Sequence, residues 1–308
     1  MRLSLSYFDV LASSDSLQFV KAQKTAVQEQ LASAKRNFEV GTATITDTRE
    51  AQARYDLVLA QEIAADNDLR VKNLALTQLV GSTEVSPKSV TAPVVLNAIS
   101  PDDVNVWVSQ SQLENQVLLQ LQVALEVAQL ETKKAQAGHL PTLDLVGKYI
   151  ATDNNGSATS TANSGSNITS LGLALNLPIF AGLSTQNRIR ETVALEAKAR
   201  TDLEGSQRTI AQATRAAFYG VQSGLGQVKA LEAAEVSSQS ALDANKLGYQ
   251  VGVRINIDVL NSQSQLFDTK AKLAKARYDV LVGGLKLRQA AGSLKLEDLE
   301  QVNTLLVK

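Results

Sequence analysis

Tyr249-Gln-Val-Gly-Val-Arg-Ile-Asn-Ile-Asp258 is the stretch that decides the fold, because it is a tight reversal between two long helical patterns. A near copy, Phe38-Glu-Val-Gly-Thr-Ala-Thr-Ile-Thr-Asp47, stands 211 residues earlier, as the positions of the two glycines show (252 − 41 = 211). In both copies a glycine follows an apolar-periodic run, which is a typical helix end, and an aspartate precedes the next run. Each copy therefore predicts the tip of a helical hairpin.

The same offset holds without a gap on both sides of the tips. Upstream, Tyr7-Phe8-Asp9-Val10 aligns with Phe218-Tyr219-Gly220-Val221. Downstream, Gln78-Leu79-Val80-Gly81-Ser82 aligns with Gln289-Ala290-Ala291-Gly292-Ser293. An in-register repeat of about seventy-five residues indicates that one helical hairpin is used twice.

The two tip aspartates have two interpretations. Asp47 and Asp258 are each placed to cap the first amides of the following helix, and Glu50 stands three residues after Asp47, which is the spacing of a capping box. The residues leave two possibilities open: the aspartates only cap their helices, or they cap the helices and also have a functional role.

Composition excludes several classes of function. The net charge of −1 argues against nucleic acid as a partner. The absence of Cys and the single histidine, His139, exclude disulfides, thiolate metal sites and multi-His ligand sets. No phosphate-binding loop or Ser-His-Asp set is present. We therefore expect neither an enzyme nor a bound cofactor or metal, and His139, which follows the helix stop at Gly138, is predicted to be a surface or hinge residue.

Most of the chain has helical periodicity. We predict helices over residues 2–39, 47–80, 111–136 and 186–250, a brief helix from Pro101 that holds Trp107 as a packing anchor, and a short amphipathic ending over 297–306. Residues 186–250 contain no proline, so this helix would be a rod of roughly 100 Å. No run of eighteen apolar residues occurs, so no transmembrane helix is predicted.

Heptad rows predict how this long helix packs on its return partner. The rows are Leu203, Ile210, Ala217, Gly224 and Leu231, and Leu266, Leu273, Val280, Leu287 and Leu294. The small residues Ala217 and Gly224 would let a neighbouring helix approach closely.

Residues 142–152 and 168–177 change from helical periodicity to a period of two. One face carries Leu143, Leu145, Gly147, Tyr149, Ala151, Leu171, Leu173, Leu175 and Leu177, and the other is mainly polar. This is the length and pattern of a tilted outer-membrane strand. A half-buried strand pair of a soluble protein has the same alternation, so the residues leave both readings open. The polar stretch 153–166 between the strands suits an extracellular loop.

Three blocks now carry a family resemblance. Ala137-Gly-His-Leu-Pro-Thr-Leu-Asp-Leu145, Leu175-Asn-Leu-Pro-Ile-Phe-Ala-Gly182 and Tyr249-Gln-Val-Gly-Val-Arg-Ile-Asn-Ile-Asp-Val-Leu260 resemble the TolC family of outer-membrane channel proteins. The resemblance implies a mainly α fold, in which long antiparallel coiled-coil helices form a periplasmic α-barrel and each chain adds strands to an outer-membrane β-barrel. It favours the membrane reading of the strand pair.

The resemblance also implies a function and partners. It implies a homotrimer in outer-membrane lipid, joined by a periplasmic adaptor (membrane fusion) protein to an inner-membrane RND or ABC transporter. Such a channel is a passive exit duct with an iris-like periplasmic gate, and it serves drug efflux or type I secretion.

The chain is expected to divide accordingly. The predicted parts are a first periplasmic hairpin (1–82), a connector (83–110), a helix of the second repeat (111–140), a strand pair with an extracellular loop (141–178), a second long hairpin (179–293) and a C-terminal equatorial segment (294–308).

Site residues follow from the same resemblance. Asp258 resembles an aspartate ring at the periplasmic entrance, and three copies would form a negative ring that favours cations. Asn261 stands where the family's best-studied type has a second acidic residue, so weaker block by multivalent cations is expected. The remaining gate residues, Thr46 and Asp47 with Tyr249 and Arg254, resemble bonding pairs that keep a hairpin closed, including a charge-assisted contact between Arg254 and Asp47.

The two tips are the predicted contact surface for the adaptor. They comprise Gly41, Thr42, Ala43, Thr44, Gly252, Val253 and Arg254. The alternative is that these residues only form the turns.

One departure from the family concerns the N-terminus. Met1 to Phe8 aligns with a helix interior and lacks the pattern of a signal peptide, so the chain is predicted to lack the family's signal peptide, first helix and two strands. Three chains with two strands each would supply only six strands. These would form an open sheet, whose edge strands would leave unpaired backbone groups in lipid. The alternatives to an outer-membrane channel with a periplasmic extension are a soluble helical scaffold and a non-functional fragment of such a channel.

Overall fold

The computed structural model describes residues 1–82, 85, 87–90, 96–156 and 163–306. The chain divides into two compact units, one formed by Met1–Asn115 with Thr209–Lys308 and the other by Gln116–Arg208. The elements are α1 (Arg2–Glu39), α2 (Ile45–Val80), α3 (Val104–Glu114), α4 (Gln116–Ala137), β1 (Thr142–Asn154), β2 (Ser164–Asn176), α5 (Ser184–Gln250), α6 (Asn256–Ala291) and α7 (Leu296–Asn303).

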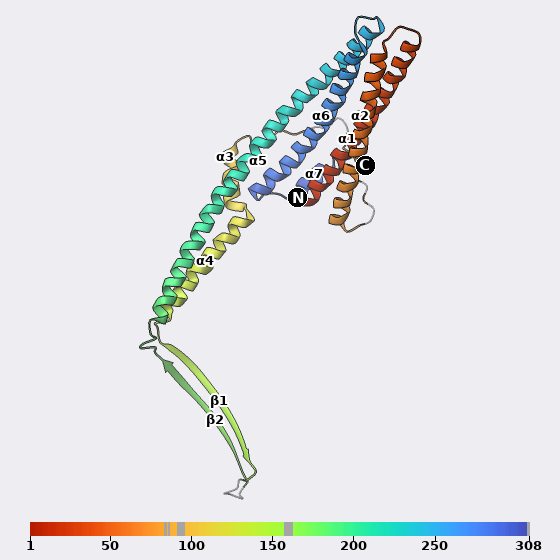
Figure 1. The fold of residues 1–308 in the computed structure, drawn as a ribbon. Coiled ribbons are helices and arrows are strands. Elements are labelled where there is room, and N and C mark those ends of the chain that lie inside the picture. The colour runs from red at the N-terminus through yellow and green to blue at the C-terminus, as the bar shows by residue number, and fades with distance from the viewer. Residues whose placement is uncertain (83–84, 86, 91–95, 157–162, 307–308) are drawn as a thin grey trace. The chain divides into compact units, whose positions relative to one another are not determined.

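The first unit is built on the two hairpins. Figure 1 shows α1 and α2 side by side with α6 next to them, and both helix tips lie at the same end of this unit. Leu260, from the second hairpin, is completely buried among the apolar side chains of the first, which are Val27, Leu31, Ala34, Ala51 and Val58. The two copies of the repeat therefore share one hydrophobic core.

The predicted helices are confirmed, and two boundaries are corrected. The second helix begins at Ile45 rather than at residue 47, because Thr44 caps it. The helix expected over 111–136 is two helices, α3 and α4, separated at Asn115, whose backbone is extended (φ −67°, ψ 122°). The Asn115 side chain donates from Nδ2 to the Ala290 carbonyl oxygen near the end of α6 (2.9 Å). This contact ties the break between α3 and α4 to the end of α6.

The heptad row predicted on α6 is the buried one, since Leu266, Leu273, Val280 and Leu287 are at most 6% exposed. On α5 the predicted row is only half-buried, and the buried residues lie one or four positions further along, at Ala211, Thr214, Phe218, Val221 and Val228. The close approach expected at Gly224 is confirmed, because a Cβ atom at this position would lie only 2.8 Å from Val280 Cγ2.

Trp107 packs as predicted. Its side chain is buried with Phe218, Leu287 and Ala291, and its Nε1 donates to the Pro101 carbonyl oxygen (2.9 Å). At the other end of the chain, α7 covers Leu296–Asn303, and Leu306 forms an isolated antiparallel bridge with Val90. Parts of the predicted connector, residues 83–84, 86 and 91–95, lie outside the described residues.

The second unit contains the strand pair. The strands β1 and β2 form an antiparallel two-stranded sheet of 13 residues each, with Leu143 opposite Leu175 and Leu145 opposite Leu173. Both strands extend into the stretch expected to be a loop, to Asn154 and from Ser164, and residues 157–162 of that stretch are not described. His139 follows α4 as an exposed residue, as expected. Within the described residues, none of the helices has the length and apolarity needed to cross a membrane.

Candidate functional site

The two helix tips have the same backbone hydrogen bonds. In the first tip, the amide of Gly41 donates to Phe38 (3.0 Å), and the amides of Thr42 and Ala43 donate to the Asn37 carbonyl oxygen (2.8 and 3.1 Å). In the second tip, Gly252 donates to Tyr249 (3.1 Å), and the amides of Val253 and Arg254 donate to Gly248 (2.9 and 3.1 Å). Gly41 and Gly252 both have the left-handed backbone, with φ of 80° and 79°. The repeat in the sequence is thus a repeat in structure.

The side chains that cap the following helices differ between the tips. Thr44 is the N-cap of α2, and its Oγ1 accepts from the Asp47 amide (3.2 Å) while Asp47 Oδ2 accepts from the Thr44 amide (2.9 Å). This is a capping box, but with Thr44 as the cap and Asp47 three residues later, so the predicted box of Asp47 with Glu50 was wrong. Thr44 is the cap because it stands directly before the helix with an extended backbone (φ −89°, ψ 158°).

Asp258 has no equivalent partner in the second tip. Ile255 occupies the N-cap position of α6 and makes no side-chain cap, so the prediction that Asp258 caps this helix was also wrong. Asp258 lies in the first turn of α6, where the positive end of the helix dipole favours a carboxylate. Its Oδ2 lies 3.7 Å from Arg254 Nη1, and both side chains are partly exposed.

The predicted contact between Arg254 and Asp47 is not present in this chain. Arg254 pairs with Asp258, and the Asp47 carboxylate is held by Thr44, also through the Thr44 hydroxyl (2.8 Å). The reason is that each partner finds a nearer group on its own tip. Thr46, the other predicted gate residue of the first tip, is exposed in the first turn of α2.

Other residues join the two tips, and sequence reasoning missed them. Asn256 is completely buried; its Oδ1 accepts from Gln30 Nε2, and its Nδ2 donates to the Asp47 carbonyl oxygen (3.2 Å). Asn37 Nδ2 donates to the hydroxyl of Tyr249 (3.2 Å). The structure therefore brings Asp47 and Tyr249 into one hydrogen-bonded seam, through Asn256 and Asn37 rather than through Arg254.

A signal for this seam is present in the sequence. Polar residues occupy every seventh position of α1, at Ser16, Gln23, Gln30 and Asn37. Gln23 continues the pattern, since its Nε2 donates to Ser264 Oγ on α6 (3.3 Å). Polar residues at every seventh position of a long helix that should pack on another helix indicate a polar interface.

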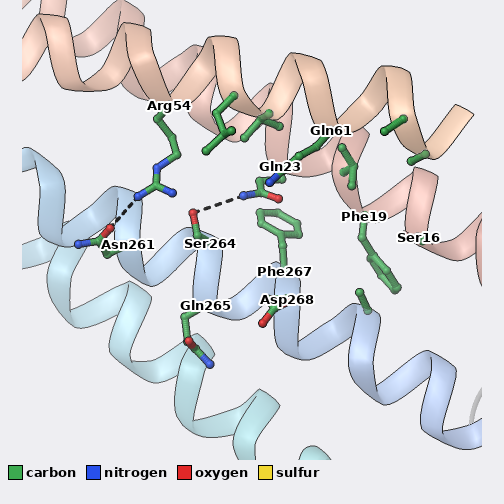
Figure 2. A pocket seen from close by; sticks show the side chains of 16 residues that line it. Ser16, Phe19, Gln23, Arg54, Gln61, Asn261, Ser264, Gln265, Phe267 and Asp268 are labelled. Atoms are coloured by element: carbon green, nitrogen blue, oxygen red, sulfur yellow. Dashed lines mark hydrogen bonds between the residues drawn. The ribbon is translucent and has the colours of Figure 1, made fainter.

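A groove of about 680 Å³ opens between α1, α2 and α6. Figure 2 shows Arg54 reaching from α2 to Asn261 on α6, with the rings of Phe19 and Phe267 further along the groove. Arg54 Nη2 donates to Asn261 Oδ1 (2.8 Å). Asn261, predicted from its position beside Asp258, is thus an acceptor for an arginine of the other hairpin.

A further polar contact between the hairpins lies in the first unit, away from the tips. The hydroxyl of Tyr278 donates to Asp15 Oδ2 (2.6 Å). Burial raises the pKa of the Asp15 carboxyl, although the hydrogen bond from Tyr278 opposes this change. Burial, followed by the same hydrogen bond, also raises the pKa of the Tyr278 hydroxyl.

The tips are turns at the ends of long helices, and they carry charged and hydrogen-bonding side chains. Of the predicted adaptor-contact residues, Gly41, Thr42, Thr44, Gly252, Val253 and Arg254 are exposed and Ala43 is half-buried. In the part of the chain that the structure describes, no group of three or more His, Asp or Glu side chains could hold a metal ion.

Known proteins match this chain over nearly its whole length. The outer membrane protein TolC of Vibrio cholerae is 33% identical over 304 residues, which are 98% of this chain and 69% of the relative. The alkaline protease secretion protein AprF of Pseudomonas aeruginosa is 31% identical over 307 residues, 98% of this chain and 63% of that protein. The chain thus spans about two thirds of the length of the curated relatives that it matches.

Solved structures and a family model agree with these relatives. A membrane protein from Pseudomonas aeruginosa has the same fold, with a TM-score of 0.81 and 21% identity over 94% of this chain and 66% of that one. The family model described as "Outer membrane efflux protein" matches residues 2–82 and 107–293, and thus includes both tips and the strand pair. The chain belongs to the outer membrane efflux protein family.

Proposed function

We propose that the chain is part of an outer-membrane channel, through which a tripartite efflux pump or a type I secretion system expels its substrates. In this proposal three copies assemble in outer-membrane lipid, and the helix tips face the periplasm. There they contact an adaptor protein that links the channel to an inner-membrane transporter. The family and the secretion protein AprF among the relatives support this assignment.

The observation that carries the proposal is the apolar face of the strand pair. Six large side chains on one face of this sheet are 66–77% exposed, namely Leu143, Leu145, Tyr149, Leu171, Leu173 and Leu175. A two-stranded sheet with such a face is not stable alone in water, because it buries no apolar surface. In lipid the same side chains are solvated, so the membrane is the environment that this face fits.

The hairpin tips support a gate in the first unit. The proposed entrance acid, Asp258, is free of a capping role, and the seam of Asn37, Asn256 and Tyr249 crosses between the two hairpins. An opening motion that parts the hairpins would break a few hydrogen bonds that water can replace. The proposal therefore places the gate at this seam.

A pair of neighbouring substitutions tests the membrane assignment. Leu171→Arg puts a charge on the apolar face, and Gly172→Arg puts the same charge on the opposite face of the same strand, across from Val146. We expect Leu171→Arg to destabilise the membrane-inserted form by about 2–4 kcal/mol and to deplete the protein from the outer-membrane fraction, whereas Gly172→Arg, where no atom lies within 4 Å of an added Cβ, changes little. Recovery of the wild-type protein from the soluble fraction as a monodisperse species without detergent would contradict the proposal and favour a scaffold.

A further inference from the structure

The side chain of Arg54 crosses from the first hairpin to the second beside the proposed entrance acid. Arg54 comes from α2, and its guanidinium donates to the side-chain oxygen of Asn261 on α6 at 2.8 Å (Figure 2). Arg54 is half-buried along the wall of the groove, and Asn261 is exposed. The contact therefore holds a cation of the first repeat against a helix of the second.

This arginine forms no ion pair with any of the described residues. Among the described residues no carboxylate oxygen lies within 4.0 Å of Arg54, whereas Arg70, on the same helix, pairs with Asp66 at 2.8 Å. Asp268, the acid that lines the same groove, is paired with Lys272 at 2.6 Å. Because its partner at position 261 is a neutral amide, Arg54 contributes a full positive charge to its surroundings.

Helix geometry places this charge next to Asp258. Asp258 and Asn261 are three residues apart on α6, so they are neighbours on one face, with Cβ atoms about 5–6 Å apart. A guanidinium held at Asn261 therefore lies within about one Debye length, ~8–10 Å, of the Asp258 carboxylate. Two charges of opposite sign at this separation still interact in physiological salt.

We propose that Arg54 is a specificity-determining residue of the channel, where it offsets the negative charge of Asp258 and lowers the preference of the entrance for cations. The inference rests on the proposed function and deepens it. Asn261 has a positioning role here, since its oxygen keeps the guanidinium on the face of α6 that bears Asp258. The arrangement also predicts that a carboxylate at position 261 is neutralised by Arg54.

Single-channel recording in planar bilayers tests this inference with the full-length protein purified from outer membranes. In a KCl gradient, Arg54→Gln should raise the cation-to-anion permeability ratio, roughly threefold, because the negative charge of Asp258 is then offset only by its weak contact with Arg254. Arg54→Lys keeps the charge and should retain the wild-type ratio. Arg70→Gln is the matched control, since it removes an arginine of the same helix that is already paired.

Block by La³⁺ from the periplasmic side provides the second readout. Asn261→Asp alone should increase the block only slightly, because Arg54 pairs with the new carboxylate. Asn261→Asp combined with Arg54→Gln should be blocked at about tenfold lower La³⁺ concentration than Asn261→Asp alone. This double variant also shows whether the lost charge, rather than altered folding, produces the effect.

The outcomes separate the inference from the function on which it rests. If the wild-type protein forms no ion-conducting channel, the proposed function fails and the inference fails with it. If channels form but Arg54→Gln has the permeability ratio of the wild type and of Arg70→Gln, the inference alone is overturned. The same holds if Asn261→Asp is blocked equally with and without Arg54.

Discussion

At the residue scale, the two tips differ in the side chain that precedes the second helix of each hairpin. Thr44 in the first copy supplies a capping hydroxyl, and Ile255 at the equivalent position in the second does not. The role of the aspartate three residues later depends on whether this residue can cap the helix. Asp47 is used to complete a capping box, whereas Asp258 is left with a weak, partly exposed contact to Arg254. A local difference thus assigns a structural role to one aspartate and leaves the other available.

Removal of the capping hydroxyl should destabilise the first tip. Thr44→Ala loses the bond to the Asp47 amide, and we expect the free energy of unfolding to fall by ~1 kcal/mol. Thr44→Ser keeps a hydroxyl and should behave like the wild type. Chemical unfolding followed by circular dichroism measures both, and an equal loss in the two variants would show that the methyl group of Thr44, and not the cap, stabilises the tip.

At the element scale, α5 and α6 approach each other where glycines replace side chains. Gly224 on α5 faces Val280 on α6, and Gly283 on α6 faces Val221 on α5, where an added Cβ atom would lie 3.0 Å from Cγ2 of the valine. These are reciprocal contacts, in which each helix receives a valine of the other. They fix the register of the two helices, because a shift by one residue would place a side chain against a side chain.

A methyl group at Gly224 should disturb this packing. Gly224→Ala is expected to lower the free energy of unfolding by about 1–3 kcal/mol, since the new Cβ atom overlaps a branched side chain that cannot swing away. Gly220→Ala and Gly226→Ala, on the same helix with no atom within 4 Å of the added Cβ, should instead stabilise it by ~0.5–1 kcal/mol. Rescue of Gly224→Ala by Val280→Ala would confirm the cause, and an unchanged melting temperature in Gly224→Ala would refute it.

The same elements show how far the sequence predicts the fold. Repeat offset, glycine stops and a change of period locate the two hairpins and the strand pair, because each is a local signal that tertiary packing reinforces. The buried row of α5 is displaced from the predicted heptad because Ala217 and Gly224 belong to the approach surface beside the core row of Phe218 and Val221. The break at Asn115 is fixed by a partner 175 residues away, which periodicity does not reveal.

At the scale of the whole molecule, the site depends on contacts between repeats that lie more than 200 residues apart. Gln30, Asn37 and Arg54 of the first hairpin meet Asn256, Tyr249 and Asn261 of the second. The family resemblance drew attention to Tyr249, Asp258 and Asn261, which stand in or directly after the second turn motif. It gave no role to Arg54, which lies outside the motif, or to Asn256, which lies within it, because their contacts depend on side-chain partners across the interface.

The contact between Asp15 and Tyr278, which also joins the two repeats, makes stability depend on pH. Burial raises the pKa of Asp15 in the folded chain, so the folded state binds this proton more tightly than the unfolded chain. The contribution is fully present below the ordinary pKa of 3.8 and is lost as the pH rises through the raised value. Asp15→Asn, which cannot ionise, should therefore gain stability relative to the wild type between acidic and neutral pH.

Unfolding by denaturant at several pH values measures this difference. Asp68 provides a control of opposite sign, because its hydrogen bond from Lys72 lowers its pKa and its contribution is lost as the pH falls. Asp68→Asn should thus lose stability relative to the wild type as the pH rises through the lowered value, by a small amount at this exposed site. A constant difference between wild type and Asp15→Asn across the acidic range would contradict the expectation.

The polar composition of the seam at the tips affects the free energy that the proposed opening would require. Its closing groups are carboxamides and a phenol, at Gln30, Asn37, Asn256 and Tyr249, and not leucines. When apolar surfaces part in water, the cost grows with every square ångström exposed, but amides that part exchange one hydrogen-bond partner for another. In the proposed gate, the outer turns of these helices would therefore part by exchanging hydrogen bonds with water, while Leu260, buried further along α6, would hold the two hairpins together by apolar contact.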